Sequence, residues 1–169
     1  MKLGTRYRFS LCEKERSLCD PCQSIHSLVV PTRFCHSYLV EQQQNVIGGE
    51  LEICSLDPLT GFYRDGYANT GPEDLGSHTV CTVVSAEFLD HQISVGNDLS
   101  TPVPEYGFPG LKPGDRWAVC AGRWQQAIDD GVPTGVVLAA TNEAAALYAS
   151  VEALLANSVD VPSDPSSLL

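Results

Sequence analysis

The sequence lacks any long apolar run. The longest early run, Leu28–Val30, ends at Pro31, whereas a membrane helix needs roughly 18 consecutive apolar residues. The same run is shorter than the roughly 7 to 15 residues of a signal-peptide core, and no small-residue cleavage pattern follows it. These absences predict a soluble protein and argue against a membrane partner and against secretion.

Basic residues are scarce over most of the chain. Of the 10 Lys and Arg and 21 Asp and Glu, 6 basic and 4 acidic residues precede Asn45, which leaves 4 basic and 17 acidic residues and a net charge of −13 from there onward. Such a surface repels phosphate backbones, so we expect no nucleic-acid partner. The alternative interpretation of the acidity is a solubility adaptation.

Two further absences concern glycine and cysteine motifs. Neither GxGxxG nor GxxxxGK occurs after a predicted strand, so no phosphate-binding loop is indicated. The 7 cysteines are odd in number and dispersed, in a chain long enough to fold without disulfides. This pattern favours reduced thiols and a cytoplasmic location.

Residues 1–44 show neither a helical nor a strand period, so we expect an extension without fixed structure. The motif Cys19-Asp-Pro-Cys22 could begin a zinc site. The next pair, Cys35-His36, has the wrong spacing, because adjacent residues rarely bind one metal ion together. Zinc is therefore a weak hypothesis.

The start of the chain admits a second interpretation. Met1 is the only methionine, while a compact domain begins near Asn45, so translation could instead begin at Val40. A transit peptide is a third reading, which the acidic residues of the extension oppose. Residues 162–169 have no periodic apolar face and are predicted to form a flexible tail.

Runs dense in β-branched or alternating apolar residues predict strands. The most distinct is 78–84, and the others are 51–54, 117–121 and 135–140. Residues 57–61 are rich in turn-forming residues, which predicts a hairpin-like reversal after the first strand.

Four segments show helical spacing and capping residues. Ser85 is placed to cap a helix that ends at Gly96, with Ala86, Leu89 and Ile93 facing the core. The other helices are expected at 123–130, at 142–148 behind a Thr141 cap, and just after Ser150.

The order of these elements predicts the fold class. Four prolines exclude a helix from residues 97–116. Short elements in mixed order indicate a single small α+β domain over residues 45–161, with a short sheet of three or more strands, three or four helices and long Gly/Pro-rich loops.

Three sets of strings carry a resemblance to a known family: Gly48–Glu52 with Asp57–Gly66, Asn69–Val80, and Gly96–Pro102 with Phe108–Trp117. They are similar to the bacterial family called domain of unknown function 2237, over residues 45–161. The resemblance implies a compact stand-alone domain of bacteria and some plastid-bearing eukaryotes, with no established activity. Many members carry cysteine where this chain has Tyr67-Ala68 and Ala118, which argues here against an obligatory metal or redox centre built on those thiols.

Two polar, glycine-rich loops, 64–78 and 97–116, are where we expect a binding site. A long irregular segment inside a small domain is more often functional than featureless. The candidate ligand-binding residues are Arg64, Asp65, Asn69, Asn97, Asp98, Ser100 and Thr101.

His78 is the main candidate for chemistry. It could act as a general base or a metal ligand oriented by Asp74, four residues earlier, although a histidine at a strand start can equally be bonded locally. Asp98 and Arg116 complete the catalytic candidates, and Asp74, His78 and Asp98 are weak candidates for a metal. The sequence identifies no cofactor.

The three cysteines of the domain, Cys54, Cys81 and Cys120, lie on predicted strands, where we expect buried thiols. A Cys81 nucleophile activated by His78 is disfavoured, because residues three apart on a strand point to opposite faces. Each arginine of the domain is expected to pair with an internal acid. The alternative is that one of them holds an anionic ligand.

Two functions remain open. The favoured one is a binding module for a small molecule or a partner protein, which uses loops 64–78 and 97–116. The alternative is a metal-assisted or acid/base enzyme that acts on a small anionic substrate with His78 and nearby carboxylates.

Overall fold

The structure, a computed structural model, describes residues 42–160. The predictions for the extension before residue 42, including the zinc hypothesis at Cys19 and Cys22, and for the tail after residue 160 lie outside the described residues. Between residues 42 and 160, no helix is long and apolar enough to cross a membrane.

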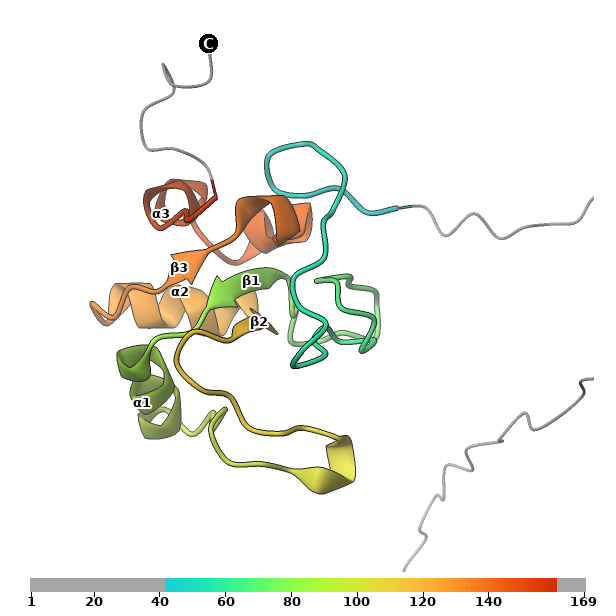
Figure 1. The fold of residues 1–169 in the computed structure, drawn as a ribbon. Helices are drawn as coiled ribbons and strands as arrows, with labels where there is room; N and C mark the ends of the chain where they lie inside the picture. The colour runs from blue at the N-terminus through green and yellow to red at the C-terminus, as the bar shows by residue number, and fades with distance from the viewer. Residues whose placement is uncertain (1–41, 161–169) are drawn as a thin grey trace, which may run out of the picture. The chain divides into compact units, whose positions relative to one another are not determined.

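A three-stranded antiparallel sheet lies at the centre of the domain (Figure 1). Its order is β2-β1-β3, with β1 (Val80–Val83) between β2 (Arg116–Val119) and β3 (Gly135–Val136). Val80 pairs with Val119 at one end of the β1–β2 ladder. Because the two strands run in opposite directions, residues just before β1 lie beside residues just after β2.

The helices within residues 42–160 are short. The α-helices are α1 (Ala86–Ser94), α2 (Ala121–Asp129) and α3 (Val151–Ala156), and the 3₁₀ helices are η1 (Pro104–Tyr106), η2 (Leu138–Ala140) and η3 (Glu143–Leu147). Together with the sheet they confirm the predicted α+β class.

One helix cap follows the sequence prediction, and a second begins the helix that was expected just after Ser150. Ser85 accepts a hydrogen bond from the Phe88 N–H at 3.0 Å and starts α1. Ser150 accepts one from the Ala153 N–H at 3.2 Å and starts α3. A side-chain oxygen at this position satisfies an N–H group that the helix itself leaves without a partner.

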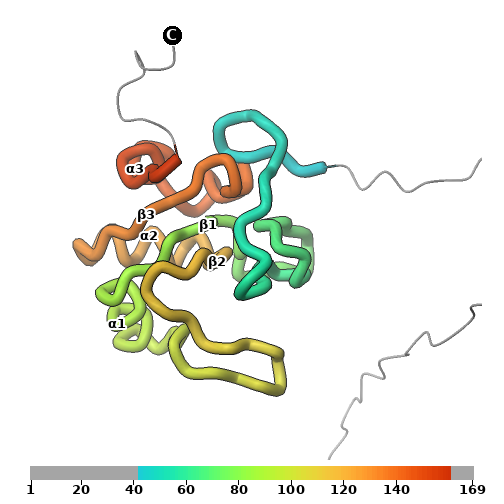
Figure 2. Tube along the Cα trace, viewed as in Figure 1, coloured from blue at the N-terminus to red at the C-terminus, as the bar shows by residue number. Residues whose placement is uncertain are grey.

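One apolar core joins the sheet to the helices. It is built around the fully buried side chains of Phe88 in α1, Trp124 in α2, Leu138 in η2 and Leu154 in α3. The long segments 57–79 and 97–115 are the green and yellow loops of Figure 2 that lead into β1 and β2, and the second of them contributes Phe108 and Leu111 to this core. The regular elements thus hold the ends of both polar loops.

Several elements differ from the prediction. Segment 51–54 is irregular, since the Glu52 N–H donates to Ala139 O and the Cys54 N–H to Gly66 O instead of to a neighbouring strand. The predicted strand 135–140 keeps only its first two residues, and 142–148 forms a 3₁₀ turn capped by Asn142.

The inward face of α1 was also predicted wrongly in part. Phe88, Leu89 and Gln92 are buried, whereas Ile93 is 48% exposed and Ala86 is also exposed. The helix is rotated from the predicted face because Phe88 fills the core next to the sheet.

Cys54 and Cys81 form a disulfide, and both are buried. The prediction of reduced thiols is therefore wrong for this pair. An odd, dispersed set of cysteines says nothing about which two approach in space, and here the Cα atoms lie 5.7 Å apart, a usual disulfide spacing. The disulfide ties segment 51–56 to β1.

Candidate active site

A cysteine and a histidine meet at one end of the β1–β2 ladder. His78 lies two residues before β1 and Cys120 directly follows β2, so the antiparallel pairing brings them together. The Cys120 Sγ atom lies 3.2 Å from His78 Nε2. The Ala121 N–H donates to Ser77 O at 2.9 Å, which joins the two segments beside the side chains.

Asp74 holds the other side of the imidazole. Its Oδ1 lies 2.6 Å from His78 Nδ1, and its Oδ2 accepts the His78 backbone N–H at 2.7 Å and the Thr70 hydroxyl at 3.0 Å. The Asp74 side chain is fully buried. Because an ionised carboxylate can only accept, Nδ1 carries a proton and Nε2 is directed at Cys120. Cys120, His78 and Asp74 therefore form a triad.

The surroundings favour a charged imidazole. The hydrogen bond with Cys120, followed by the bond with Asp74, raises the pKa of His78 from 6.5 to about 9, although burial opposes the shift. His78 is then protonated at neutral pH, and a neighbouring imidazolium favours the thiolate form of a cysteine. The Phe62 ring stacks on the imidazole, with centroids 5.9 Å apart.

Helix α2 adds its dipole to the site. Cys120 is the N-cap residue of this nine-residue helix, and a helix N-terminus carries partial positive charge that favours a thiolate. The Arg123 N–H donates back to Cys120 O. The Ala121 N–H is engaged by Ser77, whereas the Gly122 N–H makes no hydrogen bond with the described residues. One donor next to the thiol thus remains available.

Cavities flank the triad on both sides. The cavity on the sulfur side measures about 410 Å³ and is lined by Gly76, Cys120, Gly122 and Arg123 among others. The cavity on the imidazole side measures about 480 Å³ and contains His78, Arg64 and Asp98. A ligand bound on either side lies next to a reactive group.

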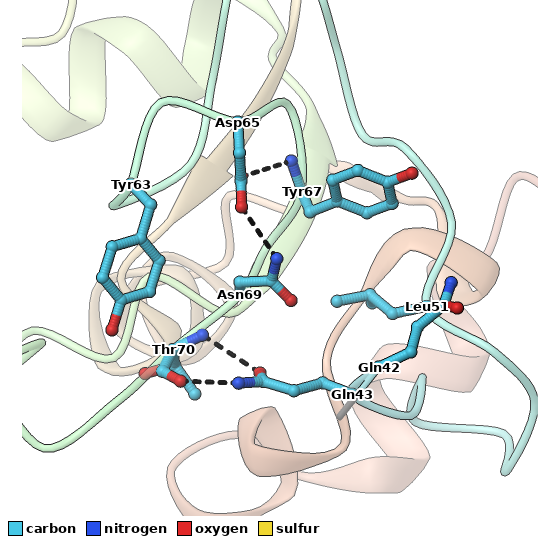
Figure 3. A pocket seen from close by; sticks show the side chains of 8 residues that line it. All are labelled: Gln42, Gln43, Leu51, Tyr63, Asp65, Tyr67, Asn69 and Thr70. Carbon is cyan, nitrogen blue, oxygen red and sulfur yellow. Dashed lines mark hydrogen bonds between the residues drawn. The ribbon is translucent and has the colours of Figure 1, made fainter. Parts of the chain in front are cut away.

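A third cavity, of about 570 Å³, is lined by Gln43, Asp65, Asn69 and Thr70 among others (Figure 3). Its wall is fixed by Asp65, which accepts the Tyr67 N–H at 3.0 Å and the Asn69 amide at 2.8 Å. Gln43 binds both the carbonyl and the N–H of Thr70, at 2.7 and 3.1 Å. Since the Thr70 hydroxyl also donates to Asp74, the wall of this cavity helps to hold the Asp74 carboxylate in place.

The residues predicted as ligands are divided among several places. Arg64 and Asp98 lie in the cavity of His78, whereas Asp65 and Asn69 lie in the third cavity. The Asn97 amide donates to Gln92 in α1 at 2.6 Å. Ser100 and Thr101 donate to Asp98, and Arg116 is exposed and lines neither cavity of the triad.

The structure does not support the metal site that the sequence suggested at Asp74, His78 and Asp98. Asp74 and His78 touch, but no group of three or more His, Cys, Asp or Glu residues between 42 and 160 is placed to hold a metal ion, so Asp98 does not join them.

The sequence prediction for Cys120 as a buried core thiol is wrong. Cys120 is free, half-buried and in contact with His78. Cys81 lies in the disulfide and is not available as a nucleophile. The sequence placed Cys120 inside the predicted strand 117–121, whereas in the structure it directly follows β2 and is the N-cap residue of α2. Its partner was hidden, because His78 lies 42 residues away along the chain.

Fold and site together define a small α+β domain with a Cys-His-Asp triad at one end of its β1–β2 ladder. The chain belongs to the domain of unknown function 2237 family, described as an uncharacterized protein conserved in bacteria, which matches residues 44–158. No curated protein matches the chain.

Proposed function

We propose that this domain is a cysteine-dependent acyl-transfer enzyme, in which Cys120 is the nucleophile and His78 the acid and base. The observation that supports it is the 3.2 Å contact between Cys120 Sγ and His78 Nε2, with His78 Nδ1 held by the buried Asp74 carboxylate. A nucleophile in contact with a base that a third group orients is the arrangement of triad enzymes. A binding module needs no such contact.

The first half-reaction acylates the thiol. The Cys120 thiolate attacks the carbonyl carbon of an ester, amide or thioester, an S–C bond forms, and the C=O π electrons move to the oxygen. The free Gly122 N–H is suited to bind that oxyanion. The intermediate collapses with cleavage of the bond to the leaving group, which takes the proton from the His78 imidazolium.

The second half-reaction consumes water. His78 Nε2, now neutral, takes a proton from a water molecule while the hydroxide oxygen bonds to the thioester carbon. The S–C bond then breaks, its electron pair returns to sulfur, and the thiolate–imidazolium pair is restored. The net change is hydrolysis of the acyl compound to an acid and the protonated leaving group.

The predicted binding function becomes part of this proposal. Arg64 and His78 from loop 64–78 and Asp98 from loop 97–116 line one cavity, which supports a small-molecule substrate as the partner. The net charge of −13 from Asn45 onward supports the exclusion of nucleic acid.

The cellular compartment affects the oxidation state of Cys120. A cytoplasmic location, as predicted, would keep Cys120 reduced, whereas the Cys54–Cys81 disulfide favours an oxidising compartment. We retain the cytoplasm as the proposal, to be tested by measuring the oxidation state of this pair in protein trapped with acid from its native cells.

The experiment mixes the full chain with p-nitrophenyl acetate, quenches in acid and maps the acetylated peptides by mass spectrometry. We expect the acetyl group on Cys120, and its loss in the Cys120→Ala chain. Acetylation spread evenly over the cysteines of residues 1–44 and Cys120 would contradict the proposal.

A further inference from the structure

The cavity beside His78 combines aromatic walls with a single arginine. The Arg64 guanidinium lies 4.9 Å from the centroid of the Trp117 ring, close enough for a cation–π contact. Trp117 is itself 5% exposed, so the guanidinium rests on the surface of the core. The other rings of this cavity are those of Phe62, Tyr106 and Phe108.

Arg64 has no carboxylate partner among the described residues. Its hydrogen bond is a long one, from Nη1 to Gly61 O at 3.4 Å. Partial burial lowers the pKa of Arg64 below its ordinary value, and no carboxylate of residues 42–160 supplies a counter-ion. An anionic ligand would supply that counter-ion through charge-assisted hydrogen bonds.

The carboxylate already present in this cavity is occupied. Asp98 accepts the hydroxyl of Thr101 at 2.6 Å and the N–H groups of Ser100 and Thr101 at 2.8 and 3.0 Å. These bonds, that of the Thr101 hydroxyl first, lower the pKa of Asp98. Its negative charge is thus held within its own turn and leaves Arg64 open to a ligand.

We infer that the substrate of the proposed reaction is an acyl compound with an apolar or aromatic body that carries a free carboxylate, and that Arg64 binds this carboxylate. The inference rests on the proposed function, because the cavity has meaning for the reaction only if Cys120 accepts the acyl group. Among residues 42–160, Arg64 is the only Lys or Arg that lines this cavity, and the net charge of −13 from Asn45 onward disfavours a dianion, so a carboxylate fits better than a phosphate.

The test measures binding without turnover. Phenylacetate, phenylacetamide and phenyl phosphate are titrated by calorimetry into the full wild-type chain and the full Cys120→Ser chain. We expect phenylacetate to bind at least about tenfold more tightly than the amide, which corresponds to one charge-assisted hydrogen bond. Equal affinity for acid and amide, no binding of phenylacetate, or tighter binding of phenyl phosphate would each overturn the inference.

Two variants assign the effect to one residue. Arg64→Gln should remove the preference for the acid, while Arg116→Gln, which changes an exposed arginine outside the cavity, should keep it. A preference that survives Arg64→Gln overturns the assignment.

The two proposals fail separately in these experiments. Inert Cys120 with intact phenylacetate binding refutes the acyl-transfer reaction alone. Acetylation of Cys120 without a preference for the acid refutes the carboxylate site alone.

Discussion

Two histidines of the domain each contact an aspartate, and their surroundings differ. His78 Nδ1 lies 2.6 Å from Asp74, whose side chain is fully buried, and its Nε2 faces a free thiol. His91 Nε2 lies 2.8 Å from Asp130, whose side chain is 51% exposed, and its Nδ1 contacts the Gln92 amide.

The contact at His91 is structural. It joins α1 to the residue after α2, and its ring nitrogens contact Asp130 and the Gln92 amide, so neither faces a thiol. At His78 the second nitrogen is directed at Cys120, with a cavity on each side. A histidine–aspartate pair is therefore not a site by itself, and the third partner decides what it can do. His91 and Asp130 also provide matched controls for His78 and Asp74.

The largest expected effect comes from removing each histidine in turn. His78→Ala should slow acetylation of Cys120 by p-nitrophenyl acetate by roughly 100-fold or more, since a general base typically contributes 10² to 10⁴. His91→Ala should leave the rate within about twofold, because the contact it removes is remote from the thiol. Stopped-flow release of p-nitrophenol measures both, and equal losses in the two variants would erase the distinction.

The two histidines also differ in their relation to the disulfide. It closes 27 residues, from Cys54 to Cys81, that include Asp74 and His78 but not His91. Replacing both cysteines by alanine should cost about 3 to 4 kcal/mol of unfolding free energy in urea, from the chain entropy of such a loop. In the folded fraction, exchange of the His78 N–H should accelerate more than that of the His91 N–H. Unchanged stability would show that the disulfide does not hold this segment.

A smaller effect is expected from a methyl group placed against the triad. A Cβ at Gly76 would lie 2.8 Å from His78 Cε1 and 3.1 Å from Cys120 Sγ, whereas one at Gly122 meets nothing within 4 Å. Gly76→Ala should reduce acetylation by about tenfold through displacement of the reacting groups. Retention of full activity in Gly76→Ala would place the reaction away from this contact.

The smallest effect concerns stability and pH. The pKa of His78 is raised from 6.5 to about 9, so its protonated form stabilises the fold fully below pH 6.5, and this contribution is lost as the pH rises through about 9. The difference in unfolding free energy between wild type and His78→Gln should therefore shrink over that interval. The difference between wild type and His91→Gln provides the comparison. A difference in unfolding free energy between wild type and His78→Gln that grows with pH would contradict the raised pKa of His78.

The sequence was sufficient where structure is local. The Ser85 and Ser150 caps and the proximity of His78 to Asp74, four residues apart, depend on neighbours along the chain. Segment 51–54 has a strand-like pattern but finds its partners at Gly66 and Ala139, which no pattern reveals.

Only the local part of the site, His78 with Asp74, could be predicted, because the other contacts join segments far apart in the sequence. The Cys120–His78 contact and the Cys54–Cys81 disulfide both require knowledge of how distant segments pair. A buried thiol and a nucleophile have the same residue type, and only their surroundings distinguish them. For Arg64, the composition predicted an internal acidic partner, but none of the described carboxylates pairs with it.

The most direct test of the triad is the rate at which iodoacetamide alkylates Cys120 between pH 5 and 9, resolved from the other cysteines by peptide mapping of the full chain. We predict that Asp74→Asn lowers this rate and that Asp130→Asn leaves it unchanged, because Asp74 holds the imidazole whose Nε2 contacts Cys120 Sγ. A rate that is the same in all three proteins at every pH would contradict the account.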